Sequence, residues 1–130
     1  MSKSKNNIIN IFLPDNQLKK QIMSIKTDSL PIESPKNPNK CNVFALYSLI
    51  ANDKEVTQMK ENYENGGFGY GEAKNKLFEL ILETYTKQRE SYKYLMQNKN
   101  EIDEILKEGS IKAKKVADEV IKRVKSKLGI

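Results

Sequence analysis

The chain has 130 residues and a mass of 15.0 kDa, which suits one domain with a single core. It has no histidine and one cysteine, Cys41, which excludes an internal disulfide and predicts no metal site. The net charge is +6. We find no apolar stretch of the length that a transmembrane helix or a secretory signal needs, so we expect a cytoplasmic protein with no membrane partner.

Apolar residues recur at helical spacing along most of the chain, which predicts an all-α fold. The first helix is expected over residues 17–25, with Asp15 or Asn16 as its N-cap. Residues 27–40 contain three prolines and predict an extended linker. The first quarter of the chain therefore provides one helix and one irregular segment.

Two shorter helices are predicted next. Residues 43–51 are mostly apolar, which indicates a buried helix capped by Asn42. Residues 55–63 show an amphipathic pattern. A loop with four glycines within six residues follows, and Gly66 is suited to end the preceding helix with a positive φ.

Two long helices complete the predicted bundle of about five helices. One follows Gly71, and its apolar stripe extends to Tyr92. The last is capped by Asn98 or Asn100, and we interpret its stripe as part of the bundle core. The members of that stripe are Ile102, Ile105, Leu106, Gly109, Ala113, Val116, Ala117, Val120, Val124 and Leu128.

The glycine loop, residues 66–71, is a candidate ligand site because its amides precede a helix N-terminus. It matches neither common glycine-rich phosphate motif, and a tight turn between helices is the alternative. Phe68 and Tyr70 could stack on unpaired bases beside Lys74 and Lys76, or they could pack into the core.

The C-terminal part is basic, since residues 107–130 hold eight basic and three acidic side chains. Lys115, Lys122 and Arg123 lie away from the apolar stripe and could contact RNA phosphates. A solvated helix face is the alternative. At the other end of the chain, Lys3 could meet a phosphate, and a polar tail is the alternative there. No nucleophile–base pair is evident.

Five stretches of the chain resemble, in the same order, the C-terminal part of bacterial tryptophanyl-tRNA synthetases, which are class I aminoacyl-tRNA synthetases. The third and fourth of these stretches are the most specific. The five are MSKSKNN at residues 1–7, IMSIKTDS at 22–29, NKCNVFALY at 39–47, GGFGYGEAK at 66–74 and ILKEGSIKAKKVADEV at 105–120.

This resemblance implies a C-terminal piece of a ligase that activates tryptophan with ATP and Mg²⁺ and transfers it to tRNA(Trp). Residues 1–16 would be the remnant of the ATP-binding catalytic loop and a linker. Residues 17–130 would be the helical anticodon-binding domain. The parent enzyme is expected to be a homodimer, and the piece alone is expected to be inactive, with no cofactor bound.

Residues 1–4, MSKS, resemble the last four residues of the family's Lys-Met-Ser-Lys-Ser loop, whose first lysine has no counterpart here. The resemblance assigns Lys3 as the catalytic lysine that neutralises charge on the leaving pyrophosphate. It places Ser2, Lys3 and Ser4 at ATP.

For tRNA, the resemblance suggests two groups of residues. Tyr70, Glu72 and Lys74, near the glycine loop, would contact the tRNA, and Lys115 and Arg123 would bind its phosphates. The alternative for Glu72 is a helix-start residue favoured by the helix dipole.

Some relatives carry an iron–sulfur cluster whose last ligand falls at Cys41. The other cysteines of that set are absent here. We therefore expect no iron–sulfur cluster, and Cys41 should be a small buried or half-buried residue.

The alternative to RNA binding is a stand-alone helical protein-interaction domain. A related expectation concerns the apolar run at residues 8–13. Without a partner domain, this run should be exposed, dock on the helices or pair with another copy, and we expect self-association or disorder there.

Overall fold

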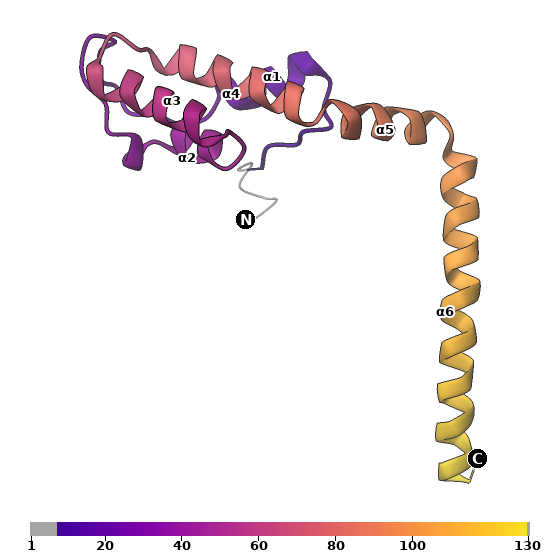
Figure 1. Ribbon diagram of the computed structural model, residues 1–130. Helices are drawn as coiled ribbons and strands as arrows, with labels where there is room; N and C mark the ends of the chain where they lie inside the picture. The colour runs from indigo at the N-terminus through magenta and orange to yellow at the C-terminus, as the bar shows by residue number, and fades with distance from the viewer. Residues whose placement is uncertain (1–7, 130) are drawn as a thin grey trace. The chain divides into compact units, whose positions relative to one another are not determined.

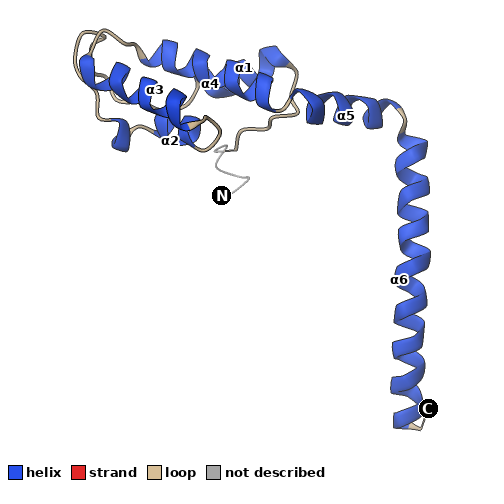
Figure 2. Cartoon of the chain, viewed as in Figure 1, coloured by secondary structure: helices blue, strands red, loops and turns tan. Residues whose placement is uncertain are grey.

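The computed structural model describes residues 8–129, and within them every regular element is helical, which confirms the all-α prediction. Ser2, Lys3 and Ser4 lie outside the described residues. Figure 2 shows the helices and the loops that join them. The elements are α1 (Asp15–Met23), the 3₁₀ turn η2 (Pro38–Lys40), α2 (Asn42–Ser48), α3 (Asp53–Asn65), α4 (Tyr70–Thr84), α5 (Thr86–Gln97) and α6 (Lys99–Leu128).

The chain divides into two compact units, one ending at Arg89 and the other beginning at Glu90. In the first unit, α4 contacts α1 and α2, and α2 also contacts α3 (Figure 1). None of the described helices is long and apolar enough to cross a membrane.

The core of the first unit is formed by the apolar faces of α1 to α4. Tyr63 lies at its centre, fully buried, with its ring 5.8 Å from that of Phe44 and 5.6 Å from that of Phe68. Burying each large side chain of this kind contributes roughly 1.5–3 kcal/mol. The other buried apolar residues are Leu18, Ile22, Cys41, Val43, Tyr47, Met59, Ala73, Leu77 and Ile81.

The apolar run at residues 8–13 docks on this core, which is one of the three outcomes that the sequence allowed, instead of being disordered as we expected; self-association stays a prediction. Ile9, Ile11 and Leu13 are partly buried against the core cluster. The guanidinium of Arg89 donates to the backbone carbonyl of Ile11 and pairs with the carboxylate of Asp15.

The proline-containing segment, residues 27–40, is irregular up to η2, as predicted, but it is held against the helices. The backbone N–H of Lys36 donates to the carbonyl of Tyr63 at 2.7 Å. The N–H of Gly67 donates to the carbonyl of Ile32 at 2.9 Å. Because these bonds join distant parts of the chain, the segment is part of the packed unit rather than a free linker.

Helix starts differ from prediction in several places. α1 begins at Asp15, and its N-cap is Pro14, which makes no side-chain capping bond, rather than Asp15 or Asn16. Asn42 is the first residue of α2, not its cap, and the N-cap Cys41 makes no side-chain capping bond. At α3, Asn52 caps the helix: its side chain accepts from the N–H of Glu55 at 3.1 Å, and its N–H donates to Glu55 Oε2 at 2.9 Å. This capping box starts α3 at Asp53, two residues earlier than the apolar pattern indicated.

The predicted long helix after Gly71 is divided into α4 and α5 at Tyr85. The hydroxyl of Thr86 donates to the carbonyls of Leu82 at 2.7 Å and Glu83 at 3.0 Å. Such bonds from a threonine back to the preceding turn bend helices. The division accounts for six described α-helices rather than about five.

The second unit corrects the interpretation of the last stripe as bundle core. No residue of α6 is buried, and Ile105 and Val116 are 65% and 63% exposed. A Cβ added at Gly109 would meet nothing within 4 Å. The spacing predicts an apolar face, but it does not predict that this chain supplies a partner for that face.

Candidate nucleic-acid interface

The glycine loop is a tight turn that only glycine fits at its first position. Gly66 and Gly67 both have a φ of +75°. A Cβ on Gly66 would lie 2.4 Å from the carbonyl oxygen of Glu33, whereas one on Gly67 would meet nothing within 4 Å. The loop therefore joins α3 to α4 while the proline-containing segment passes directly over it.

Of the two loop aromatics, Phe68 packs into the core and Tyr70 lies at its edge. Phe68 is 6% exposed and its ring contacts that of Tyr63. Tyr70 is half-buried, with its ring edge-on to Tyr63 at 6.0 Å. Burial, and then the carboxylate of Asp28, raise the pKa of the Tyr70 phenol, so the phenol is neutral at physiological pH.

The two charged residues of the loop differ in what they contact. Glu72 is exposed in the first turn of α4, where a carboxylate also favours the helix N-terminus. The ammonium of Lys74 donates to the carbonyl of Met23, the last residue of α1, at 3.0 Å. Lys74 therefore links α4 to α1 within the first unit, whereas Glu72 forms no ion pair among the described residues.

Lys115 and Arg123 lie on α6 in the second unit, and both are exposed. Among the described residues neither forms an ion pair, whereas their neighbour Lys114 pairs with Asp118 at 2.8 Å. At a rise of about 1.5 Å per residue, the two side chains leave the helix about 12 Å apart along its axis. They are available to a polyanion.

A buried lysine, Lys36, was missed in the sequence. Lys36 is 3% exposed, and its ammonium donates to the carbonyls of Pro31, Ile32 and Ser34, each at 3.0 Å. It also lies 5.4 Å from the centre of the Tyr70 ring. No periodicity marks this residue, because its partners are irregular backbone. Its contacts are those of a structural cation.

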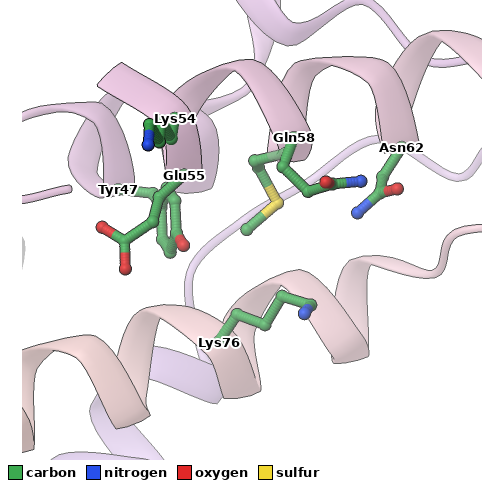
Figure 3. A pocket seen from close by; sticks show the side chains of 7 residues that line it. Tyr47, Lys54, Glu55, Gln58, Asn62 and Lys76 are labelled. Carbon is green, nitrogen blue, oxygen red and sulfur yellow. The ribbon is translucent and has the colours of Figure 1, made fainter. Parts of the chain in front are cut away.

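A pocket of about 380 Å³ lies between α3 and α4 and was also missed. Figure 3 shows Gln58 and Asn62 on α3 facing the space above α4, from which Lys76 rises. The signal was present in the sequence, because Lys54, Gln58 and Asn62 recur every four residues, which places them on one helix face. Tyr47, Glu55 and Met59 complete the lining.

The electrostatics of the pocket are set by two lysines and one carboxylate. Glu55 Oε2 already accepts from the backbone of Asn52, so this carboxylate is fixed at the start of α3. Burial first, and then the charge of Glu55, raise the pKa of Tyr47. Tyr47 is therefore a neutral wall, and Lys54 and Lys76 leave the lining with a net positive charge.

Cys41 is buried, as expected, and its Sγ lies 3.4 Å from the hydroxyl of Tyr63. In residues 8–129 no group of three or more His, Cys, Asp or Glu side chains could hold a metal ion. Iron–sulfur clusters take several cysteine ligands, and the chain has one. The absence of a cluster stays a prediction.

Curated relatives match the whole chain. It is 43% identical to a tryptophan–tRNA ligase of Fusobacterium nucleatum over 130 residues, 39% identical to one of Campylobacter jejuni and 35% identical to one of Pseudomonas aeruginosa. Each match covers the whole of this chain but only 40%, 41% and 29% of these three proteins, respectively. The aligned region is their C-terminal part. No protein-family profile matches the chain.

A solved structure gives the same result. The crystal structure of a tryptophanyl-tRNA synthetase from Campylobacter jejuni, complexed with ADP and tryptophan, matches with a TM-score of 0.93 at 39% identity. The match covers 100% of this chain and 41% of that one. The resemblance seen in five sequence stretches thus extends over the whole chain and its fold.

Proposed function

We propose that this chain, which matches the C-terminal part of tryptophan–tRNA ligases along its whole length, is the tRNA-binding part of such a ligase. The observation that carries the proposal is the full-length match, at 43% identity to one ligase and with a TM-score of 0.93 to a solved synthetase. The helices would receive the anticodon loop of tRNA(Trp).

In the whole enzyme, tryptophan would be activated with ATP and Mg²⁺ in the cytoplasm, by a homodimer. Ser2, Lys3 and Ser4 would approach ATP, with Lys3 at the leaving pyrophosphate; these residues lie outside the described part of the chain. We expect no exchange of pyrophosphate into ATP by this chain alone. Tryptophan-dependent exchange in a clean preparation would contradict that expectation.

The RNA-binding role is supported by charge and exposure. Lys115 and Arg123 are exposed and unpaired by acids among the described residues, as phosphate contacts require. Tyr70, Glu72 and Lys74 lie at the start of α4. Because Tyr70 and Lys74 also hold the fold together, Glu72 is the member of this group whose replacement tests RNA contact most directly.

A second candidate function is a helical protein-interaction domain without RNA binding. The exposed apolar stripe of α6 favours it, since a stripe of this length is unusual on a solvated surface. Salt dependence separates the two functions. RNA binding weakens steeply as salt rises, and contact through an apolar face does not.

The test is binding of tRNA(Trp) transcript to the chain, against a copy with a changed anticodon, at low and moderate salt. We expect preference for the native anticodon and weaker binding at higher salt. The variant Lys115→Gln/Arg123→Gln should weaken binding to both RNAs. Lys20→Gln/Lys87→Gln removes the same charge from exposed positions of the first unit and serves as its control.

The outcomes separate the two functions. Equal affinity for both RNAs would leave a basic surface without anticodon recognition. No binding at either salt would contradict the proposed role of this chain and favour the protein-interaction domain.

A further inference from the structure

We infer that the pocket between α3 and α4 binds one unpaired RNA nucleotide, with Gln58 and Asn62 contacting the edge of its base. This inference rests on the proposed function and assigns a site to it. The pocket has a volume of about 380 Å³, within the range of small-ligand sites. None of the tRNA-contact residues suggested by the resemblance lines it.

Gln58 and Asn62 offer hydrogen-bonding groups that the fold does not use. Their side chains lie one turn apart on α3 and face the same space (Figure 3). Within residues 8–129, neither side chain has a hydrogen-bond partner. An amide presents both a donor and an acceptor, which is the pattern that base edges require.

The walls suit the flat body of a base. Met59 is 2% exposed and Tyr47 is 7% exposed, so the floor of the pocket is well packed and apolar. A thioether makes favourable contacts with an aromatic ring. Polar groups surround an apolar floor, as in sites that hold an unstacked base.

The charges suit the phosphates on either side of such a base. Lys54 comes from the first turn of α3 and Lys76 from α4, and neither forms an ion pair among the described residues. Glu55, the one acid of the lining, is held by the backbone of Asn52. The two ammonium groups can bind phosphates as mobile point charges while the amides contact the base.

A protein partner fits the pocket less well. Interfaces between proteins centre on aromatic and aliphatic anchors and are depleted of lysine. Four of the seven lining residues carry free amide or ammonium groups: Lys54, Gln58, Asn62 and Lys76.

The experiment measures binding of the anticodon stem–loop of tRNA(Trp) to the 130-residue chain and to the variants Gln58→Ala and Asn62→Ala. Gln58 is exposed and Asn62 half-buried, so neither change disturbs the core. We expect each variant to bind about tenfold to a hundredfold more weakly. Asn16→Ala/Gln17→Ala removes two exposed amides from α1 and should bind like the unchanged chain.

A second series replaces each loop nucleotide in turn with an abasic one. At one position the abasic RNA should lose at least as much affinity as Gln58→Ala does, and adding Gln58→Ala should weaken its binding no further, because the base that Gln58 contacts is already absent. The side-chain amide resonances of Gln58 and Asn62 should shift when the stem–loop is added.

Three results would overturn this inference. Unchanged, salt-sensitive binding by both variants would overturn it while the proposed function stood. If every abasic RNA lost the same affinity, the loss would not arise from contact between the pocket and one base. Failure of the unchanged chain to bind the stem–loop would contradict the proposed function and this site together.

Discussion

The ammonium of Lys36 lies 5.4 Å from the centre of the Tyr70 ring, buried beneath the proline-containing segment. Three backbone carbonyls accept from the same ammonium at 3.0 Å. The charge is therefore solvated by the protein and fastens an irregular segment to the start of α4.

We expect Lys36→Met to lower the free energy of unfolding by about 1–3 kcal/mol, because methionine keeps most of the volume but removes the donor that three backbone carbonyls share. Lys40→Met, at an exposed position of the same segment, should change it by less than about 0.5 kcal/mol. Urea unfolding followed by helical circular dichroism measures both. Equal values for the two variants would show that the Lys36 bonds add no stability.

The glycine loop gives a second matched pair. Gly66→Ala and Gly67→Ala both place a Cβ at a φ of +75°, which costs roughly 1–3 kcal/mol of strain. At Gly66 the new Cβ would also lie 2.4 Å from the carbonyl oxygen of Glu33. We therefore expect Gly66→Ala to be clearly the more destabilising, by urea unfolding. The opposite order would mean that the proline-containing segment moves away at little cost.

The spacing of apolar residues predicted the helices because the buried face of each helix follows that spacing, as Leu18 and Ile22 show in α1. It did not predict the break at Tyr85, since the hydroxyl of Thr86 bonds to the preceding turn only in the folded helix. The α6 stripe was interpreted as core because spacing reveals an apolar face and not its partner.

The candidate site was less predictable, because its contacts join residues far apart in the chain. Lys74 bonds to the carbonyl of Met23, which lies far from it in the chain, and no spacing rule anticipates such a pair. The pocket is different. The recurrence of Lys54, Gln58 and Asn62 on one face of α3 was visible in the sequence, but polar faces usually only meet solvent.

Two leucines allow the core of the first unit to be compared with the exposed apolar stripe of α6. Leu77 is fully buried in α4 and Leu106 is 63% exposed in α6. We expect Leu77→Ala to cost about 2–5 kcal/mol and Leu106→Ala to cost less than about 0.5 kcal/mol. Urea unfolding at low protein concentration gives both values. A large loss for Leu106→Ala would show that the stripe is covered in solution.

The last prediction concerns pH and the buried phenol of Tyr63. Burial first, and then the hydrogen bond to Cys41, raise the pKa of Tyr63 above its ordinary value of 10.0. Above about pH 10 the phenol ionises in the unfolded chain but stays neutral in the folded one. The contribution of Tyr63 to stability is therefore complete below this pH and is lost as the pH rises.

Tyr63→Phe removes this titration. The difference in unfolding free energy between the unchanged chain and Tyr63→Phe should be constant from pH 7 to 9 and should shrink as the pH rises above 10, because other titrating groups cancel in the difference. Urea unfolding at each pH measures it. Parallel curves up to pH 11 would mean that the phenol ionises as readily in the folded chain as in the unfolded one, so that Tyr63 is reached by water and the core opens around the Cys41 contact.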